Sequence, residues 1–254
     1  MRIAVAGGTG QAGAQAVRAA QERGHETVVL ARSAGVDLVT GDGAAAALAG
    51  VDAIIDASGV RPGDEPIAFH EAVVRTLARA GKDAGATRLV VLSIVGCDRA
   101  ATYPLYAGKV AQEHAAAASG IPCTIARTTQ FHEFAAMIWR AGRRGPLHFA
   151  PRMRTQPVAV REVGEHLVDL AEHGRDGHAP DFAGPHEESL VAMVRAYAGA
   201  VGSGRAVIPL RMGGDFGRAQ RDGSLLPGTH ATLGTQTYAQ WVAALAASSA
   251  GGAG

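Results

Sequence analysis

Apolar residues in the first half of the chain form short continuous runs, and segments with helical spacing of apolar positions separate these runs. The runs lie at residues 3–6, 26–31, 36–39, 51–57, 88–93 and 121–127. The helical patterns between them lie at residues 14–23, 44–49, 67–84 and 104–118. Short continuous apolar runs are typical of strands in a parallel sheet that helices cover on both faces. The pattern therefore predicts an α/β fold with a doubly wound parallel sheet and right-handed crossovers.

The pattern changes after residue 134, where the apolar runs become shorter and less regular. Strand-like pieces at residues 147–149, 154–157 and 206–209 alternate there with helical segments. We expect a cofactor-binding domain over residues 1–150 and a smaller, substrate-covering region over residues 151–245. Residues 246–254 lack core-forming side chains, so we expect a disordered tail there.

The composition limits the kind of partner. The chain has 254 residues, of which 47% are hydrophobic, and 24 Lys and Arg balance 23 Asp and Glu. This balance indicates no nucleic-acid or membrane partner, and we expect a small-molecule substrate and a monomer or homodimer. Met1 directly precedes the first strand and no apolar run reaches the ~18 residues of a membrane span, so we expect a cytoplasmic protein. Cys97 and Cys123 lack CxxC spacing and are expected to be buried free thiols. The histidines show no metal-ligand spacing, and we expect no metal site.

A glycine-rich turn, Gly7-Gly8-Thr9-Gly10-Gln11-Ala12-Gly13, lies between the first strand and the first helix. Glycine allows the chain to turn sharply and to bring backbone N–H groups close to a phosphate at a helix N-terminus. The strand-turn-helix context favours a dinucleotide-binding turn over a plain glycine-rich turn. We assign the cofactor diphosphate to Gly7, Thr9, Gly10, Gln11 and Gly13.

Other strand ends supply further candidates, because ligands of doubly wound sheets bind beyond the carboxyl ends of the strands. The second strand ends at Arg32 and Ser33, and a guanidinium beside a hydroxyl favours the 2′-phosphate of NADP(H) over NAD. The alternative for Arg32 is a solvated loop charge. Asp42 either contacts the adenine or caps the next helix. Ala57-Ser58-Gly59 either lets the backbone pass close to the cofactor or forms a plain turn after the strand.

These motifs resemble those of the atypical, extended short-chain dehydrogenases/reductases, in particular the NmrA-like NAD(P)H-binding proteins. The resemblance rests on the glycine turn, Leu30-Ala31-Arg32-Ser33, Leu92–Gly96 (LSIVG), Lys109 within YAGKVAQE, and Ala126–Phe134 (ARTTQFHEF). It implies a Rossmann cofactor domain with a variable C-terminal lid. Members include isoflavone-type and quinone reductases as well as cofactor sensors without turnover.

The resemblance also implies a catalytic serine and a Tyr-x-x-x-Lys pair, whose lysine lowers the tyrosine pKa and binds the nicotinamide ribose. Ser93 and Lys109 match these positions, although a backbone-satisfying serine and a helix-surface lysine are the alternatives. Leu105 stands where the tyrosine is expected, and Tyr106 is rotated from that direction by ~100° on a helix. The proton for a reduction then comes from Tyr106, His132 or water, or the acceptor is a conjugated system whose anion stabilises itself.

The residues expected to line the substrate pocket include aromatic and methionine side chains, which suit a flat apolar substrate. They are Ile94, Val95, Gln130, Phe131, His132, Phe149 and Met153. The sequence thus predicts an NADPH-dependent oxidoreductase that acts on a small aromatic, quinonoid or conjugated carbonyl compound. Two alternatives stay open: a non-catalytic NADP(H) sensor, and a redox-neutral isomerase, epimerase or dehydratase.

Overall fold

The computed structural model describes residues 1–251, and these form two compact units. Unit 1 combines Met1–Thr128 with Val160–Pro180, and unit 2 combines Thr129–Ala159 with the chain from Asp181 onward. The chain thus leaves unit 1, returns to it and leaves it again. The two units therefore do not meet at one boundary in the sequence near residue 150.

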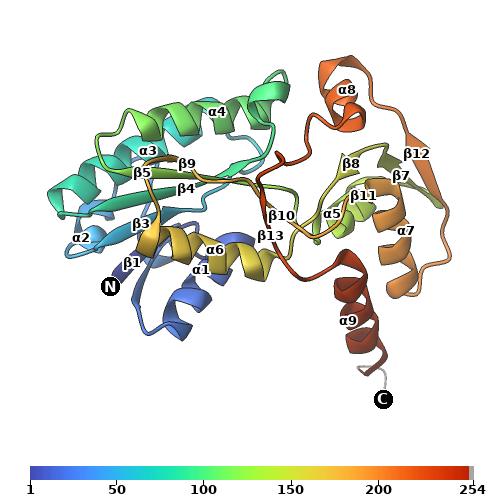
Figure 1. Ribbon diagram of the computed structural model, residues 1–254, viewed down its shortest axis with the longest axis horizontal. Coiled ribbons are helices and arrows are strands. Elements are labelled where there is room, and N and C mark those ends of the chain that lie inside the picture. Colours follow the sequence, from blue (N-terminus) through green and yellow to red (C-terminus); the bar gives the residue numbers. More distant parts are fainter. Residues whose placement is uncertain (252–254) are drawn as a thin grey trace. The chain divides into compact units, whose positions relative to one another are not determined.

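Unit 1 contains the parallel sheet that the apolar runs predict, which confirms the α/β, doubly wound class (Figure 1). Its strands are β1 (Arg2–Ala6), β2 (Glu26–Leu30), β3 (Ala53–Asp56), β4 (Arg88–Ile94), β5 (Cys123–Thr128) and β9 (Gly177–His178). Their order is β2-β1-β3-β4-β5-β9, and every neighbouring pair is parallel. In the centre, Val5 pairs with Val29 on one side and with Ile55 on the other.

One predicted strand, at residues 36–39, is wrong. The structure has a loop there, between two glycines with positive φ, Gly35 and Gly41. The Asp37 carboxylate accepts hydrogen bonds from the backbone N–H groups of Val39 and Thr40, which closes a local turn in place of a strand ladder.

Helices cover both faces of the unit 1 sheet (Figure 1). Their bounds are α1 (Gln11–Glu22), α2 (Ala44–Leu48), α3 (Pro66–Asp83), α4 (Pro104–Ala117) and α6 (Val160–His173). Helix α1 packs against α6, and α3 packs against α4. Leu48, Ile54, Leu77 and Leu89 are fully buried in one cluster between the sheet and the α2 and α3 helices. The close packing of α3 on α4 requires Gly108, because a Cβ there would lie 2.7 Å from Cβ of Pro66.

Unit 2 is built from short elements. Its helices are α5 (Phe134–Ala141), α7 (Leu190–Ala200), α8 (Gly214–Asp222) and α9 (Tyr238–Gly251). Its longer strands are β7 (Leu147–Pro151) and β12 (Val207–Leu210), and its two-residue strands are β6 (Arg143–Arg144), β8 (Arg154–Thr155), β10 (Phe182–Ala183), β11 (Glu188–Ser189) and β13 (Thr232–Leu233). They form a sheet of order β12-β7-β6, an antiparallel β8–β11 pair and a parallel β10–β13 pair.

Helix α9 includes residues 246–251, for which the sequence predicts a disordered tail. Alanine has the highest intrinsic helix propensity, so the alanines in this stretch favour a helix. The last three residues of the expected tail, 252–254, lie outside the described residues. Across residues 1–251, none of the helices is both long and apolar enough to cross a membrane.

Candidate cofactor site and buried polar network

The glycine turn after β1 forms a close-packed cradle. Gly7 has φ of 70°, and a Cβ at this position would lie 2.7 Å from the Ala57 carbonyl oxygen after β3. A Cβ at Gly13 would overlap the carbonyl oxygen of Gly7. The turn is closed by a hydrogen bond of 2.8 Å from Gly10 N to Gly7 O. Only glycine fits at Gly7 and Gly13, as the sequence predicts.

Helix α1 begins at this cradle without a side-chain cap. Gly10 is the N-cap residue, it has no side chain to accept from the first turn, and the first turn contains no acidic residue. The N–H groups of a first helical turn have no partner within the helix, and the helix dipole attracts negative charge to them. The glycine cradle and the uncapped N-terminus therefore fit the diphosphate of a dinucleotide.

The residues after β2 are placed where the sequence predicts. Arg32 and Ser33 are exposed in a short 3₁₀ helix, Arg32–Ala34, directly after the strand. Asp42 is exposed and accepts a hydrogen bond of 2.7 Å from the Thr40 hydroxyl. It does not cap α2, because Gly43 is the N-cap residue there and no side chain caps this helix.

The end of β3 leads into a buried polar chain. Asp56 is fully buried and accepts hydrogen bonds from the Ser58 backbone N–H (3.0 Å) and from Gln112 Nε2 (2.7 Å). Gln112 Oε1 in turn accepts from Lys109 Nζ at 2.9 Å, and Lys109 Nζ also donates to the Leu92 carbonyl at 2.9 Å. Burial lowers the pKa of Lys109 from its ordinary value, although the nearby Asp56 carboxylate opposes this shift.

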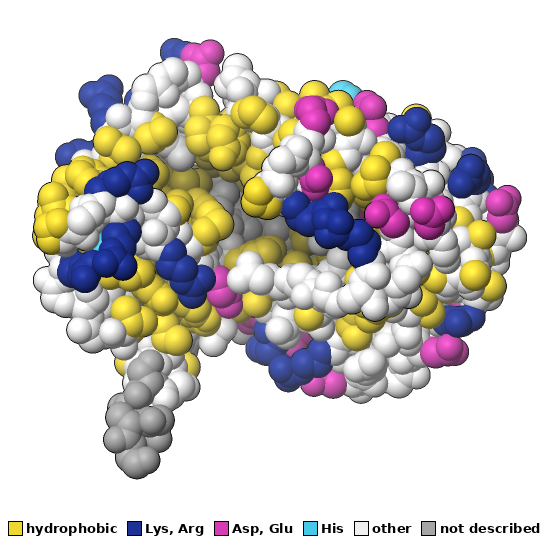
Figure 2. All heavy atoms as spheres, turned by 180° about the vertical axis from the view of Figure 1, so that it is seen from behind, with side chains coloured by type: hydrophobic (Ala, Val, Ile, Leu, Met, Phe, Trp, Pro, Cys, Tyr) yellow, Lys and Arg dark blue, Asp and Glu magenta, His cyan; other side chains and the backbone are white. Residues whose placement is uncertain are grey.

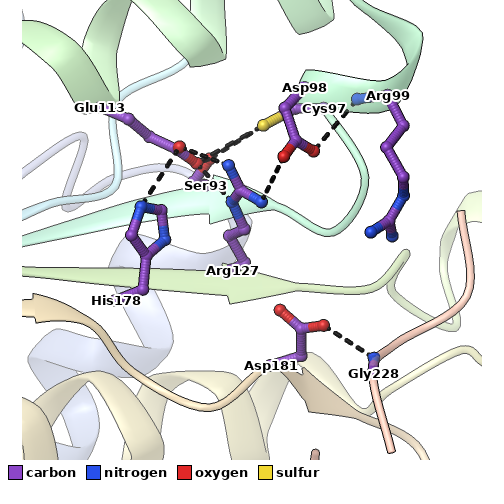
Figure 3. Close-up of polar contacts among 9 residues, drawn as sticks. All are labelled: Ser93, Cys97, Asp98, Arg99, Glu113, Arg127, His178, Asp181 and Gly228. Carbon is purple, nitrogen blue, oxygen red and sulfur yellow. Dashed lines mark hydrogen bonds and ion pairs between the residues drawn. The ribbon is translucent and has the colours of Figure 1, made fainter.

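A second buried network surrounds Glu113, four residues after Lys109 on α4 (Figure 3). Arg127, on β5, binds both carboxylate oxygens, with Nε at 2.8 Å from Oε1 and Nη2 at 2.6 Å from Oε2. The Ser93 hydroxyl and the Cys97 thiol also donate to Oε1. These bonds and the charge of Arg127 hold the pKa of Glu113 below its ordinary value, against the opposing effect of burial. Burial and the adjacent Glu113 charge raise the pKa of Cys97 to about 11.

The other predicted residues of unit 1 are mostly buried. Tyr106 is 5% exposed, with its ring edge-to-face on Tyr103 at a centroid distance of 5.8 Å. Leu105, in the expected tyrosine position, is half-buried. Val95 is fully buried, whereas Ile94 is partly exposed at the end of β4.

The predicted substrate residues of unit 2 have different environments. His132 is fully buried, with Nε2 3.2 Å from the Gln236 carbonyl and its ring against Tyr238. This placement favours a packing role for His132 over contact with a substrate. Gln130 accepts a hydrogen bond of 2.6 Å from the Thr155 hydroxyl. Phe131 and Phe149 are half-buried, and Met153 is 5% exposed.

Four members of the buried networks were not predicted from the sequence: Asp56, Gln112, Glu113 and Arg127. One signal was present, because Lys109, Gln112 and Glu113 have i, i+3, i+4 spacing and so share one face of a helix. Three polar residues on a helix that covers a buried sheet require partners on that sheet.

Comparisons with known proteins identify the family and the fold. The model of a family described as NAD(P)H-binding matches residues 7–173. No curated protein matches the chain in sequence.

Several solved structures share the fold, each at low identity. An NADPH-dependent quinone oxidoreductase from Escherichia coli, solved with NADPH, has 17% identity and a TM-score of 0.70, covering 96% of this chain and 99% of its own. A triphenylmethane reductase from Citrobacter sp., solved with NADP(H), has 17% identity and a TM-score of 0.64 over 90% and 93%. A short-chain dehydrogenase/reductase superfamily protein from Agrobacterium tumefaciens, with bound NAD, has 15% identity and a TM-score of 0.72 over 100% and 98%.

Proposed function

The chain belongs to the NAD(P)H-binding family, and from this premise we propose that it is an NADPH-dependent oxidoreductase for a small aromatic, quinonoid or conjugated carbonyl compound. The observation that carries the proposal is the glycine cradle with the uncapped N-terminus of α1. The choice of NADPH over NADH rests on Arg32 and Ser33, which are exposed directly after β2. A guanidinium matches a phosphate with a fork of donors, whereas a ribose hydroxyl pairs better with a carboxylate.

In this proposal the bound cofactor supplies the hydride, and the protein positions it. The turn at Gly7–Gly13 binds the diphosphate, and Arg32 binds the 2′-phosphate. Lys109 donates two hydrogen bonds within the protein, to Leu92 and Gln112, and a third N–H of its ammonium would serve a ribose hydroxyl.

The proposed substrate class follows from which groups near the end of β4 can donate a proton to a substrate. The Ser93 hydroxyl donates to Glu113, a carboxylate that can only accept, so this hydroxyl cannot also donate to a substrate oxygen. Leu105 has no proton to give. A simple ketone needs a proton as the hydride arrives, whereas a quinone or an extended conjugated acceptor delocalises the charge it gains. The arrangement therefore supports the conjugated class.

Two titrations and an assay test the proposal. NADPH should bind more tightly than NADH, and Arg32→Ala should weaken NADPH about tenfold or more while leaving NADH nearly unchanged. Arg75→Ala removes an exposed arginine of α3 and should change neither affinity. In the assay, the protein should oxidise NADPH when a quinone or an enone from a panel is present as the hydride acceptor. If Arg32→Ala weakened the binding of NADPH and NADH equally, Arg32 would not be the residue that binds the 2′-phosphate.

A non-catalytic NADP(H) sensor is the second candidate, and Leu105 in the tyrosine position favours it. Tight NADPH binding without turnover of any acceptor would support the sensor. Leu105→Tyr is then informative, because a gain of carbonyl reduction would show that the rest of the site can still catalyse.

A further inference from the structure

The near-neutral net charge of the chain conceals an uneven distribution between the two units. Unit 1 carries 14 Lys and Arg against 17 Asp and Glu, whereas unit 2 carries ten Arg against six Asp and Glu. The excess is concentrated further in two segments of unit 2, residues 134–159 and 189–214. Together these contain eight arginines and no acidic residue.

These two segments form the sheet of order β12-β7-β6 and the helices α5 and α7. One face of the sheet is buried: Val207 pairs with His148, and the two are 6% and 3% exposed. The His148 ring stacks on Trp139 of α5 at a centroid distance of 3.3 Å, and Arg195 of α7 donates to the Val207 carbonyl. Helices α5 and α7 therefore contact the side on which His148 and Val207 lie.

The opposite face is apolar and exposed. Side chains alternate along a strand, so the residues next to His148 and Val207 point the other way. Leu147, Ile208 and Leu210 are 38%, 36% and 42% exposed, and Phe149, which pairs with Ile208, is half-buried. We call Leu147, Phe149, Ile208 and Leu210 the outer face. Exposed apolar groups that share one face of a sheet are a signature of an interaction surface.

Arginines flank the outer face. Arg144 pairs with Leu147 across the β6–β7 ladder, and Arg211 directly follows Leu210. Arg205 reaches the β6–β7 turn, where its guanidinium is 3.5 Å from the Gly145 carbonyl. Within the described part of the chain, these three form no salt bridge with an acidic side chain. Figure 2 shows Lys or Arg side chains interspersed with apolar ones on the left part of the visible face.

The arginines and the exposed apolar side chains together limit which partner can bind the outer face. A second copy of the chain, docked through the same face, would bring arginine against arginine. A nucleic acid would use the arginines but would leave the exposed aliphatic side chains without a partner. An anionic lipid surface uses both, because its headgroups attract the arginines and its interface accepts the aliphatic groups.

We propose that the outer face and Arg144, Arg205 and Arg211 dock unit 2 on an anionic phospholipid surface. The contact is peripheral. It is independent of the proposed reductase activity, and it would give such an enzyme access to apolar acceptors dissolved in a bilayer.

Vesicle flotation tests the proposal with the full chain. The vesicles contain phosphatidylcholine alone, or phosphatidylcholine with about a third of phosphatidylglycerol, at about 0.1 M salt, where surface charges still act over about 10 Å. Arg144→Ala with Arg211→Ala removes two flanking charges. Ile208→Thr with Leu210→Thr removes apolar groups and places β-branched threonine, which suits a strand, at both positions. Arg75→Ala with Arg79→Ala, on exposed positions of α3 in unit 1, is the matched charge control.

The native protein should bind only the anionic vesicles. Loss of two arginines should weaken binding roughly 20- to 30-fold, the threonine pair should weaken it about tenfold, and the α3 control should bind like the native protein. Far-ultraviolet circular dichroism establishes that each variant is folded.

Three results would overturn the proposal: no binding to anionic vesicles, equal weakening by the α3 control, or unchanged binding by the threonine pair. The last result, combined with equal affinity for a DNA duplex, would assign the arginines to polyanion binding by charge alone. Because NADPH binding is measured in solution without vesicles, failure here leaves the proposed function untouched.

Discussion

Removal of the Glu113 carboxylate should destabilise unit 1 more than any surface substitution, and Glu113→Leu is the perturbation that tests this. Glu113 is 4% exposed and accepts from Arg127, Ser93 and Cys97. The Arg127 side chain is only 15% exposed. Without Glu113, its guanidinium stays in a poorly solvated position. Among the described residues it then keeps one acidic partner, the Asp98 carboxylate, which is 3.1 Å away and half exposed to water.

The magnitude follows from this geometry. Breaking a buried ion pair by removing one partner costs about 3–5 kcal/mol, because the remaining charge is left without compensation. Asp98 offsets part of this cost, whereas the lost acceptor for Ser93 adds about 1 kcal/mol. We therefore expect Glu113→Leu to lower the free energy of unfolding by about 3–4 kcal/mol. Replacing both partners, Glu113→Leu with Arg127→Met, should restore much of this loss, because an apolar pair leaves no buried charge.

Urea unfolding at neutral pH, followed by far-ultraviolet circular dichroism, measures the two single variants and the double variant. Glu71→Leu, at an exposed position of α3, is the control for adding a leucine to a helix and should change stability by less than about 0.5 kcal/mol. A loss below about 1 kcal/mol in Glu113→Leu would refute the reasoning. So would a double variant that loses the sum of the two single losses, since the side chains would then be uncoupled.

The same site should respond to acid in a defined direction. The pKa of Glu113 is lowered on folding, so its stabilising effect is complete above the pKa of the unfolded chain, about 4.3, and is lost as the pH falls through the folded value. The stability difference between the native protein and Glu113→Gln should therefore shrink as the pH is lowered from 6 towards 3. A difference that stays constant over this range would contradict the assignment.

Two further predictions concern the cradle and an unpaired histidine. Gly13→Ala should weaken NADPH binding at least about tenfold, because the added Cβ would overlap the Gly7 carbonyl and displace the turn. The control is Gly199→Ala in α7, where a Cβ has open space, and this variant should bind NADPH normally in the same titration. His70 is fully buried, neither ring nitrogen has a hydrogen-bond partner in the described structure, and burial lowers its pKa to about 2. Below pH 6.5, His70 takes up a proton in the unfolded chain but not in the folded protein. The free energy of unfolding therefore decreases as the pH is lowered, by up to about 1.4 kcal/mol per pH unit. His70→Leu should flatten this dependence in urea titrations between pH 6.5 and 4.

The sheet was predictable from sequence because most of its longer strands are built around short apolar runs, such as residues 3–6 and 89–92, with no competing periodicity. The run at residues 36–39 failed for a related reason. Val36 and Leu38 are buried, at 5% and 8% exposure, so they are apolar as anchors of a loop that packs on the core. An apolar run in the sequence indicates that its residues are buried, but burial alone does not distinguish a strand from a loop that packs on the core.

The candidate site was predictable where local geometry determines it and not where partners arrive from distant segments. Gly7 and Gly13 were predictable because the turn itself requires them. Ser93 and Lys109 were identified by resemblance, but their partners Glu113 and Gln112 depend on how α4 docks on the sheet. The charge of unit 2 was hidden for a similar reason, since the composition of the whole chain averages two units that interleave along the sequence.

The docking of α4 links the fold to the proposed chemistry. Lys109, Gln112 and Glu113 lie on one face of this helix and bond to Leu92, Asp56 and Arg127, which lie on three different strands. These bonds fix the helix on the sheet, and they also occupy the proton of Ser93 and two protons of Lys109. Because these groups already donate hydrogen bonds within the protein, few proton donors are left for a substrate. An acceptor that needs a hydride but no simultaneous proton from the protein is therefore the one that this arrangement suits, and its reduction rate should change little with pH across the neutral range.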